Sequence, residues 1–332
     1  MELSELVNNL YFNIVLLAIS FAILLKAADY FVESAAGLAL YFDLPKMLVG
    51  ILVVAFGTTA PEISVSAQSS LMGEPEFAFG NAIGSVIVDD GVGMALAALI
   101  SPVVISIEKN LLRSVALFII AIDTLAYILS LNGVIGRLEG MVFMAILSSY
   151  LFYMVYSEKK RKSSLAFYDE EIIQAAEKQK GSLLKIILML TGGLAGVIIA
   201  SRLIIYSAKF IAVYFQVPKA VIGLTVIAIG TSLPEISTCI IASAKGHGEI
   251  AVGDILGADI LNILWIIGLS AAVNPIHIDI FTVHFSFISM LVIVLTMLGV
   301  MLLKYRLPRW SGALLLALYA AYAFLNYRFY HM

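Results

Sequence analysis

Apolar runs long enough to cross a lipid bilayer recur along the whole sequence and limit its fold more than any other feature. A helix needs about 20 apolar residues to cross a hydrocarbon core about 30 Å thick. Hydrophobic residues make up 61% of the 332 residues, against about 45–50% in soluble domains. We therefore predict an all-α integral membrane protein with ten transmembrane helices. The predicted spans cover residues 10–40, 46–72, 77–101, 111–131, 136–157, 183–214, 219–245, 249–273, 282–304 and 308–328.

The rest of the composition excludes several classes of protein. Cys239 is the only cysteine, so an intrachain disulfide or a cysteine metal cluster is impossible. No stretch offers the basic, exposed surface that nucleic-acid binding requires, and nothing in the sequence indicates a cofactor or a protein partner. The first basic residue is Lys26, so the N-terminus lacks the basic region of a signal peptide and we expect the first span to be retained.

Positive charges in the loops predict the orientation, because Lys and Arg favour the cytoplasmic side. They cluster after the third, fifth and ninth predicted spans. The clusters are Lys109 and Arg113; Lys159, Lys160, Arg161 and Lys162; and Lys304, Arg306 and Arg309. We therefore expect a multi-pass protein of the cell membrane with both termini outside the cytoplasm.

The sequence repeats itself at an offset of 173 residues. Residues 57–64 read Gly-Thr-Thr-Ala-Pro-Glu-Ile-Ser, and residues 230–237 read Gly-Thr-Ser-Leu-Pro-Glu-Ile-Ser. Each half contains five predicted spans, an odd number, so the second copy must cross the membrane inverted. Inverted repeats are typical of secondary transporters, whose substrate sites lie near the midplane where the repeats meet.

We therefore predict two inverted five-helix repeats. The first covers residues 1–157, with its repeated segment at about 46–101. The second covers residues 183–332, with its repeated segment at about 219–273. Residues 158–182, which are rich in Lys, Glu and Asp, are expected to form a cytoplasmic linker.

Each copy of the motif breaks a helix and supplies oxygen ligands. Pro61 has no N–H, so the carbonyl of Gly57 loses its helical partner. Thr58 and Glu62 are four residues apart and share a helix face, and the second copy has the same pattern. Carbonyl, hydroxyl and carboxylate oxygens are the ligands that Ca²⁺ prefers. An acid at the bilayer centre costs about 2.5–3.5 kcal/mol, so one in each repeat indicates function.

Polar residues on the third and eighth spans extend this candidate site. Asn81, Ser85 and Asp89 are spaced by four, and at the same offset they match Asp254, Ala258 and Asn262. If these two rows of polar residues both face the motif helices, the site contains three carboxylates and four neutral side chains. These are Glu62, Glu235 and Asp89, with Thr58, Thr231, Ser85 and Asn262.

Basic residues are scarce in the regions that carry these acids. Residues 47–108 contain no Lys or Arg, and residues 220–303 contain only Lys245. Bound cations, protons, or Lys26 and Arg202 of the first and sixth spans must therefore balance the carboxylates. Three negative charges can bind either one divalent cation or several monovalent cations. An antiporter needs a site of this kind, in which each ion can replace the other.

These motifs resemble the cation/calcium exchanger superfamily, specifically its sodium/calcium exchanger branch in prokaryotic form. The resemblance rests on the doubled Gly-Thr-x-x-Pro-Glu, followed in each half by Gly-x-x-x-Gly, and extends over nearly the whole chain. It implies a central Ca²⁺ site flanked by Na⁺ sites, with the first and sixth spans sliding across a fixed core. By position, it also implies ligands at Thr59, Ser232 and the carbonyls of Ala55 and Ala228.

The chain also departs from the family pattern. Ala258 lacks a hydroxyl expected at one sodium site, and the charge at Asp89 and Asn262 is swapped between the halves. Three acids are additional: Asp90, Asp254 and Asp259. Proton-coupled relatives usually carry Gly-Asn-x-x-Glu, so the motif here favours sodium coupling.

The sequence thus predicts a secondary-active antiporter that exchanges Na⁺ for Ca²⁺ and is not an enzyme. A Ca²⁺/H⁺ antiporter, with the extra aspartates as proton carriers, is the alternative. An intramembrane aspartyl protease with an Asp89–Asp254 dyad, and a channel, are competing classes. Asp29 and Arg202 also match at the offset, so a cross-repeat ion pair between them is possible.

Overall fold

Helices make up almost all of the computed structural model, which describes residues 9–165, 182–216 and 228–330. Three short segments, labelled η, are π-helical. In chain order the helices are α2 (Leu10–Phe42), α3 (Lys46–Val49), η1 (Gly50–Val54), α4 (Ala55–Thr58), α5 (Ala60–Leu71), α6 (Pro75–Val88), η2 (Asp89–Met94), α7 (Ala95–Ile100), α8 (Lys109–Ser130), α9 (Arg137–Leu165), α11 (Leu183–Tyr214), α13 (Ala228–Thr231), α14 (Leu233–Ala244), α15 (Gly248–Leu261), η4 (Asn262–Ile267), α16 (Gly268–Val273), α17 (Ile280–Lys304) and α18 (Arg309–Tyr330).

Several of these helices can cross a membrane. Within the described residues, seven helical runs are long and apolar enough, or eight if the bent pair Lys46–Thr58 and Ala60–Leu71 counts as one span. The span predicted at 308–328 is observed as α18 but is not among the seven. The span predicted at 219–245 is described only from residue 228. The chain is thus an all-helical membrane protein, and the count of ten spans stays a prediction.

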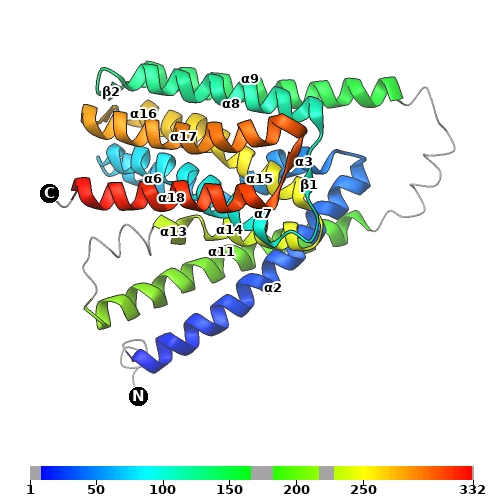
Figure 1. Ribbon diagram of the computed structural model, residues 1–332, viewed down its shortest axis with the longest axis horizontal. Coiled ribbons are helices and arrows are strands. Elements are labelled where there is room, and N and C mark those ends of the chain that lie inside the picture. The colour runs from blue at the N-terminus through cyan, green and yellow to red at the C-terminus, as the bar shows by residue number, and fades with distance from the viewer. Residues whose placement is uncertain (1–8, 166–181, 217–227, 331–332) are drawn as a thin grey trace.

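Two short antiparallel sheets mark opposite ends of the molecule (Figure 1). β1 (Ile105–Ser106) pairs with β4 (Arg306–Leu307) at one end, and β2 (Val134–Ile135) pairs with β3 (Ile276–His277) at the other. We call these the β1 end and the β2 end. α9 ends at the β1 end and continues to Leu165, so the first residues of the predicted linker are helical. Residues 166–181 of that linker lie outside the described part.

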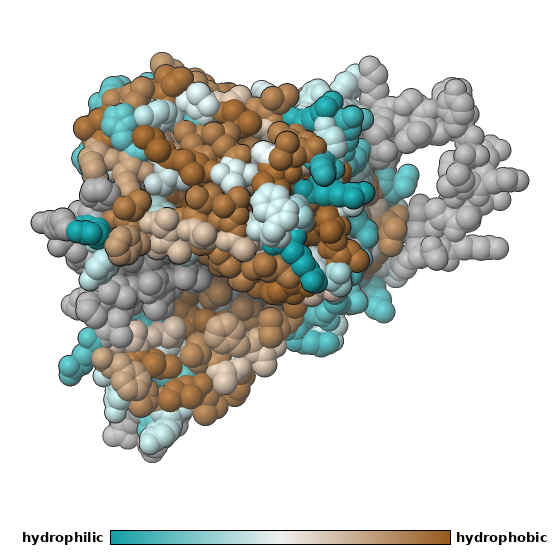
Figure 2. Space-filling view, in the orientation of Figure 1, coloured by the Kyte–Doolittle hydropathy of each residue, from teal (hydrophilic) through white to brown (hydrophobic). Residues whose placement is uncertain are grey.

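The start of α2 and the end of α18 lie at the β2 end (Figure 1). Between the two ends, Figure 2 shows a surface that is largely apolar, with hydrophilic residues gathered toward the β1 end. An apolar belt between two polar ends is the surface that a membrane-spanning bundle needs.

The helix boundaries themselves recur at the offset of 173. Adding 173 to both bounds of α4, α5, α6, η2 and α7 gives the bounds of α13, α14, α15, η4 and α16. The π-helical turns therefore begin at matching residues, Asp89 and Asn262. Similar sequences in the two halves produce the same succession of break, helix and π-turn.

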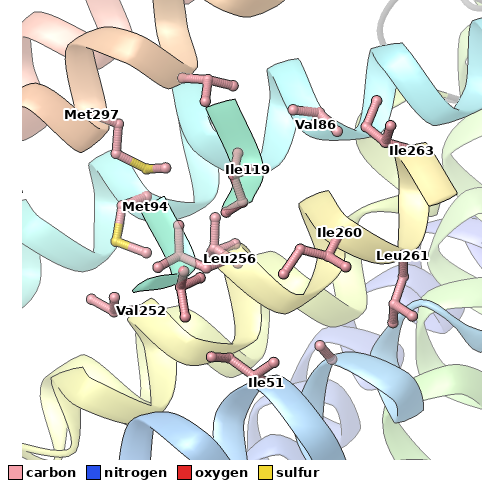
Figure 3. Close-up of a cluster of buried hydrophobic side chains, with 14 of the residues drawn as sticks. Ile51, Val86, Met94, Ile119, Val252, Leu256, Ile260, Leu261, Ile263 and Met297 are labelled. Carbon is pink, nitrogen blue, oxygen red and sulfur yellow. The ribbon is translucent and has the colours of Figure 1, made fainter. Parts of the chain in front are cut away.

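The two halves touch backbone to backbone where η1 crosses α15. A methyl group on Gly50 would lie 2.6 Å from the carbonyl oxygen of Ile250 and 2.7 Å from Cα of Gly253. Only glycine fits at such a contact. Apolar side chains surround it, and Figure 3 shows Ile51 of η1 below α15, which carries Val252, Leu256 and Ile260. This contact fixes the first motif helix against the second half.

α2 and α11 pack along each other and form a hydrophobic cluster of their own. That cluster is separate from the main core and consists of Leu24, Ala27, Ala28, Val197, Ala200 and Ile204. Further along α2, Phe31, Val32 and Ala35 join the main core. The pair also contacts the rest of the molecule through Leu233 and Ile241 of α14, which pack against the cluster, and through Leu190 and Leu194 of α11, which pack against the main core.

Candidate cation site

Both motif copies interrupt their helices two residues before the proline. Thr59 separates α4 from α5, and Ser232 separates α13 from α14. In the first copy the two helix axes differ by 48°, which confirms the predicted break. Pro61 and Pro234 lie in the first turn of the following helix, where a missing N–H leaves no hydrogen bond unmade.

The break directs two carboxylates into the protein. Glu62 and Glu235 lie in the first turns of α5 and α14, and each is only 1% exposed. The helix N-terminus favours a negative charge there. The last turns of α4 and α13 present carbonyl oxygens to the same break, and such helix C-terminal ends favour cations.

Most of the other predicted ligands are buried with these acids. The buried side chains are Ala55, Thr58, Thr59, Ser85, Asp89, Ser232 and Asn262. Thr231 is half-buried at the end of α13. Ala228 begins α13, and its side chain lies outside the described ones. The carbonyl of Ala55 already accepts hydrogen bonds from the backbone N–H of Thr59, at 2.9 Å, and from the Thr58 hydroxyl, at 3.3 Å.

The three predicted carboxylates come together. Glu62 interacts electrostatically with both Glu235 and Asp89, although the three lie on α5, α14 and η2. Thr58 and Thr59 of the first motif face Glu235, and Ser232 of the second faces Asp89. Hydroxyl groups of each motif thus face an acid of the other repeat: Glu235 lies on α14 of the second repeat, and Asp89 lies on η2 of the first.

Many oxygens in this group have no hydrogen-bond partner. Among the described residues, the unpartnered buried atoms include Thr59 Oγ1, Glu62 Oε1 and Oε2, Ser85 Oγ, Asp89 Oδ1, Ser232 Oγ, Glu235 Oε2, and Asn262 Oδ1 and Nδ2. Buried polar groups without partners are rare unless a ligand or water satisfies them. Oxygen atoms that gather in this way fit a hard cation.

The carboxylates alone do not form a complete coordination shell. No three His, Cys, Asp or Glu side chains in the described ranges converge at distances that would hold one metal ion. Hydroxyl and backbone oxygens must therefore contribute.

The rows of polar residues on α6 and α15 are only partly directed at the site. Asn81 donates a hydrogen bond to Ser66 Oγ at 3.0 Å and is tied to α5. Asp254, its match, is fully buried and accepts a hydrogen bond from Thr58 Oγ1 at 3.0 Å. The Cys239 thiol lies 3.7 Å from the second oxygen of Asp254. The sequence excludes a disulfide and a cysteine metal cluster at Cys239 but did not predict this contact, and the position of Cys239 on the motif helix α14 was the available signal.

A second group of acids lies next to the first. Asp90 and Asp259 are buried with their carboxyl groups together, and Asp123 of α8 interacts with both. None of these six oxygens has a hydrogen-bond partner in the described part of the chain. Asp90 and Asp259 were predicted as extra acids. Asp123 was missed, although an acid inside an apolar span is itself a signal.

The basic residues considered as counter-charges lie elsewhere. Lys245, after α14, pairs with Asp29 at 2.5 Å and with Glu33 at 3.0 Å, and the ion pairs of the described residues include none between Asp29 and Arg202. Lys26 is largely exposed and lies 3.6 Å from Asp29. Among the described residues, no ion pair reaches Glu62, Glu235 or Asp89.

Lys245 belongs to a polar cluster at the β1 end. Lys46 Nζ lies 3.0 Å from His247 Nδ1. Burial, followed by the positive charges of Lys46 and Lys245, lowers the pKa of His247. A neutral His247 then accepts a hydrogen bond from Lys46, and this bond ties the start of α3 to the loop before α15.

Comparison with known proteins identifies the family. The profile of the family described as sodium/calcium exchanger protein matches residues 12–157 and 185–328. This chain belongs to that family. The exchanger-family chain is 32% identical to the inner membrane protein YrbG of Escherichia coli over 266 residues, which cover 80% of this chain and 81% of YrbG. It is 28% identical to the sodium/calcium exchanger MaX1 of Methanosarcina acetivorans, over 93% and 97% of the two chains.

Solved structures of the sodium-calcium exchanger NCX_Mj share the fold of this exchanger-family chain. One of them, soaked with 10 mM Na⁺ and no Ca²⁺, matches with a TM-score of 0.80 and 27% identity, over 94% of this chain and 98% of NCX_Mj. The fold is thus that of a membrane cation exchanger of the prokaryotic branch.

Proposed function

We propose that this chain exchanges Na⁺ for Ca²⁺ across the cell membrane by alternating access. The group of unpartnered buried oxygens around Glu62, Glu235 and Asp89 carries the proposal. Buried acids without a basic partner need exchangeable cations or protons. The names of MaX1 and NCX_Mj, both called sodium/calcium exchangers, support the choice of ions.

In this proposal Ca²⁺ bridges Glu62 and Glu235, and Na⁺ ions occupy overlapping and flanking positions. Asp89 supplies the third negative charge. The neutral ligands are the side chains of Thr58, Thr59, Thr231, Ser232, Ser85 and Asn262 and the carbonyls of Ala55 and Ala228. No cofactor enters the exchange.

Alternating access is assigned to α2 and α11. Their separate hydrophobic cluster supports movement as a unit across the core formed by the other helices. The moving pair takes one helix from each proposed repeat, residues 1–157 and 183–332, with residues 158–182 as the linker.

The β1 end is proposed to face the cytoplasm, with both termini outside. Basic residues at that end support this orientation: Lys109, Arg113, Lys304, Arg306 and Arg309. Cys239 is buried, so new cysteines report on sidedness. A membrane-impermeant maleimide should label Asn132→Cys, at the β2 end, in intact cells. Ser106→Cys, at the β1 end, should react only after permeabilisation, and the reverse pattern would invert the orientation.

Ca²⁺/H⁺ exchange is the second candidate, favoured by the buried carboxyl groups of Asp90, Asp123 and Asp259. Purified protein in liposomes separates the two. Radioactive Ca²⁺ uptake should follow an imposed Na⁺ gradient and ignore a pH gradient. Uptake that follows only the pH gradient would replace sodium coupling by proton coupling.

A matched pair of variants tests the site in the same assay. Glu235→Gln should abolish Ca²⁺ uptake, whereas Glu76→Gln, the same change at an exposed acid, should leave it unchanged. Retained uptake in Glu235→Gln would refute the assignment of Glu235.

A further inference from the structure

Asp254 lies beside the cation site and has no place among the proposed ligands. It is fully buried on α15, and Thr58 Oγ1 donates a hydrogen bond to its Oδ1 at 3.0 Å. Asp254 also interacts electrostatically with Glu235. It thus lies behind Thr58 as seen from the proposed ion.

The Thr58 hydroxyl has one proton and several acceptors around it. Val54 and Ala55 carbonyl oxygens lie 3.2 and 3.3 Å away, and Asp254 Oδ1 is the nearest acceptor, at 3.0 Å. Thr58 also faces Glu235. The proton therefore has two competing carboxylates, one on each side of the hydroxyl.

The direction of that proton decides what Thr58 can do. Directed at Glu235, the hydroxyl satisfies the acid and offers no free oxygen to an ion between them. Directed at Asp254, it turns oxygen lone pairs toward Glu235, and a cation between the two facing acceptors satisfies both. We infer that Asp254 is a positioning residue that accepts the hydrogen bond of the Thr58 hydroxyl and thereby leaves the Thr58 oxygen free to bind a cation.

The other half of the molecule carries a different group at the matching position. The match of Asp254 is Asn81, an amide whose N–H donates to Ser66 Oγ at 3.0 Å. The inference is therefore made for the first motif, and Asn81 provides a matched control position.

The inference rests on the proposed function, and a double-mutant cycle tests it. The full-length protein in liposomes, and in detergent for calorimetric Ca²⁺ binding, is compared with Asp254→Ala, Thr58→Val and the double variant. Asp254→Ala should raise the Ca²⁺ concentration for half-maximal uptake about 10–100-fold, as loss of an outer-shell partner does. The maximal rate should persist, which a merely structural role would not predict. Asn81→Ala should leave both values unchanged.

The decisive outcome is coupling between the two positions. If Asp254 acts through Thr58, adding Asp254→Ala to Thr58→Val should have no further effect. If instead the losses in the two single variants multiply in the double variant, the inference is overturned and Asp254 acts on the ion independently of Thr58. Thermal unfolding of each variant in detergent separates misfolding from weakened binding, and Asp254→Asn, whose side-chain oxygen can still accept the Thr58 hydrogen bond, should recover part of the affinity. An inactive but folded wild-type protein would instead refute the proposed exchange itself.

Discussion

The two halves of the molecule have the same backbone and different side chains at the site. Helix bounds from α4 to α7 recur from α13 to α16 at one offset. At matching positions, however, Asp89 stands against Asn262, and Ser85 against Ala258. The repeated Gly-Thr-x-x-Pro-Glu builds the break twice, and the unmatched residues make the two sides of the site chemically unequal. The geometry and one glutamate are therefore duplicated, whereas the third carboxylate, Asp89, comes from the first half alone.

The largest effect on Ca²⁺ uptake is expected at Glu62 and Glu235, where the two halves carry the same residue. Glu62→Gln and Glu235→Gln should each reduce Ca²⁺ uptake by more than the roughly 10–100-fold typical of outer-shell changes, because each removes a charged ligand. Calorimetric Ca²⁺ binding should be lost in both. A variant that binds Ca²⁺ normally would show that the two motifs do not contribute equally.

The next largest effect on Ca²⁺ binding is expected at positions 89 and 262, where one half carries Asp and the other carries Asn. Asp89→Asn should weaken Ca²⁺ binding roughly tenfold or more, since the site keeps two carboxylates of three. Combining it with Asn262→Asp restores three charges and should recover much of the affinity. If the double variant binds as weakly as Asp89→Asn, position 262 does not face the same ion.

The matching glycines Gly80 and Gly253 should differ in how much a substitution changes the free energy of unfolding. A methyl group on Gly253 would overlap the carbonyl oxygen of Met47, whereas one on Gly80 meets no described atom within 4 Å. Gly253→Ala should therefore lower the free energy of unfolding by about 1–3 kcal/mol. Gly80→Ala should be neutral or stabilising, by up to about 1 kcal/mol. Thermal unfolding in detergent measures both, and equal losses would contradict the asymmetric contact.

The smallest effect is expected at the missing hydroxyl. Ala258→Ser should add one oxygen ligand, and one neutral polar contact contributes about 1 kcal/mol. The Na⁺ concentration that half-maximally competes with Ca²⁺ should then fall about fivefold. Ser85→Ala should shift it in the opposite direction. An unchanged value in Ala258→Ser would show that this position does not line a sodium site.

Much of the fold and the centre of the site follow from the sequence, for local reasons. Span length fixes the membrane helices, and Pro61 and Pro234 with their flanking residues fix the breaks. Glu62 and Glu235 stand out because acids are costly in an apolar run. The partners of Asp29 and Asp254 were not predictable in this way, because they depend on how α2 and α15 pack against distant elements. Helical periodicity shows which residues lie on the same face of a helix. It does not show which residues of other helices pack against that face.

The contact between Gly50 and Gly253 has a consequence for how the chain is made. The two glycines are 203 residues apart (253 − 50 = 203). At about 5–20 residues per second, the ribosome reaches the second some 10–40 s after the first. During that interval the newly inserted amino-terminal helices lack the backbone surface against which they finally close. Biogenesis of this protein must therefore keep an unfinished half in the bilayer until its counterpart emerges, and premature termination leaves a product that cannot mature.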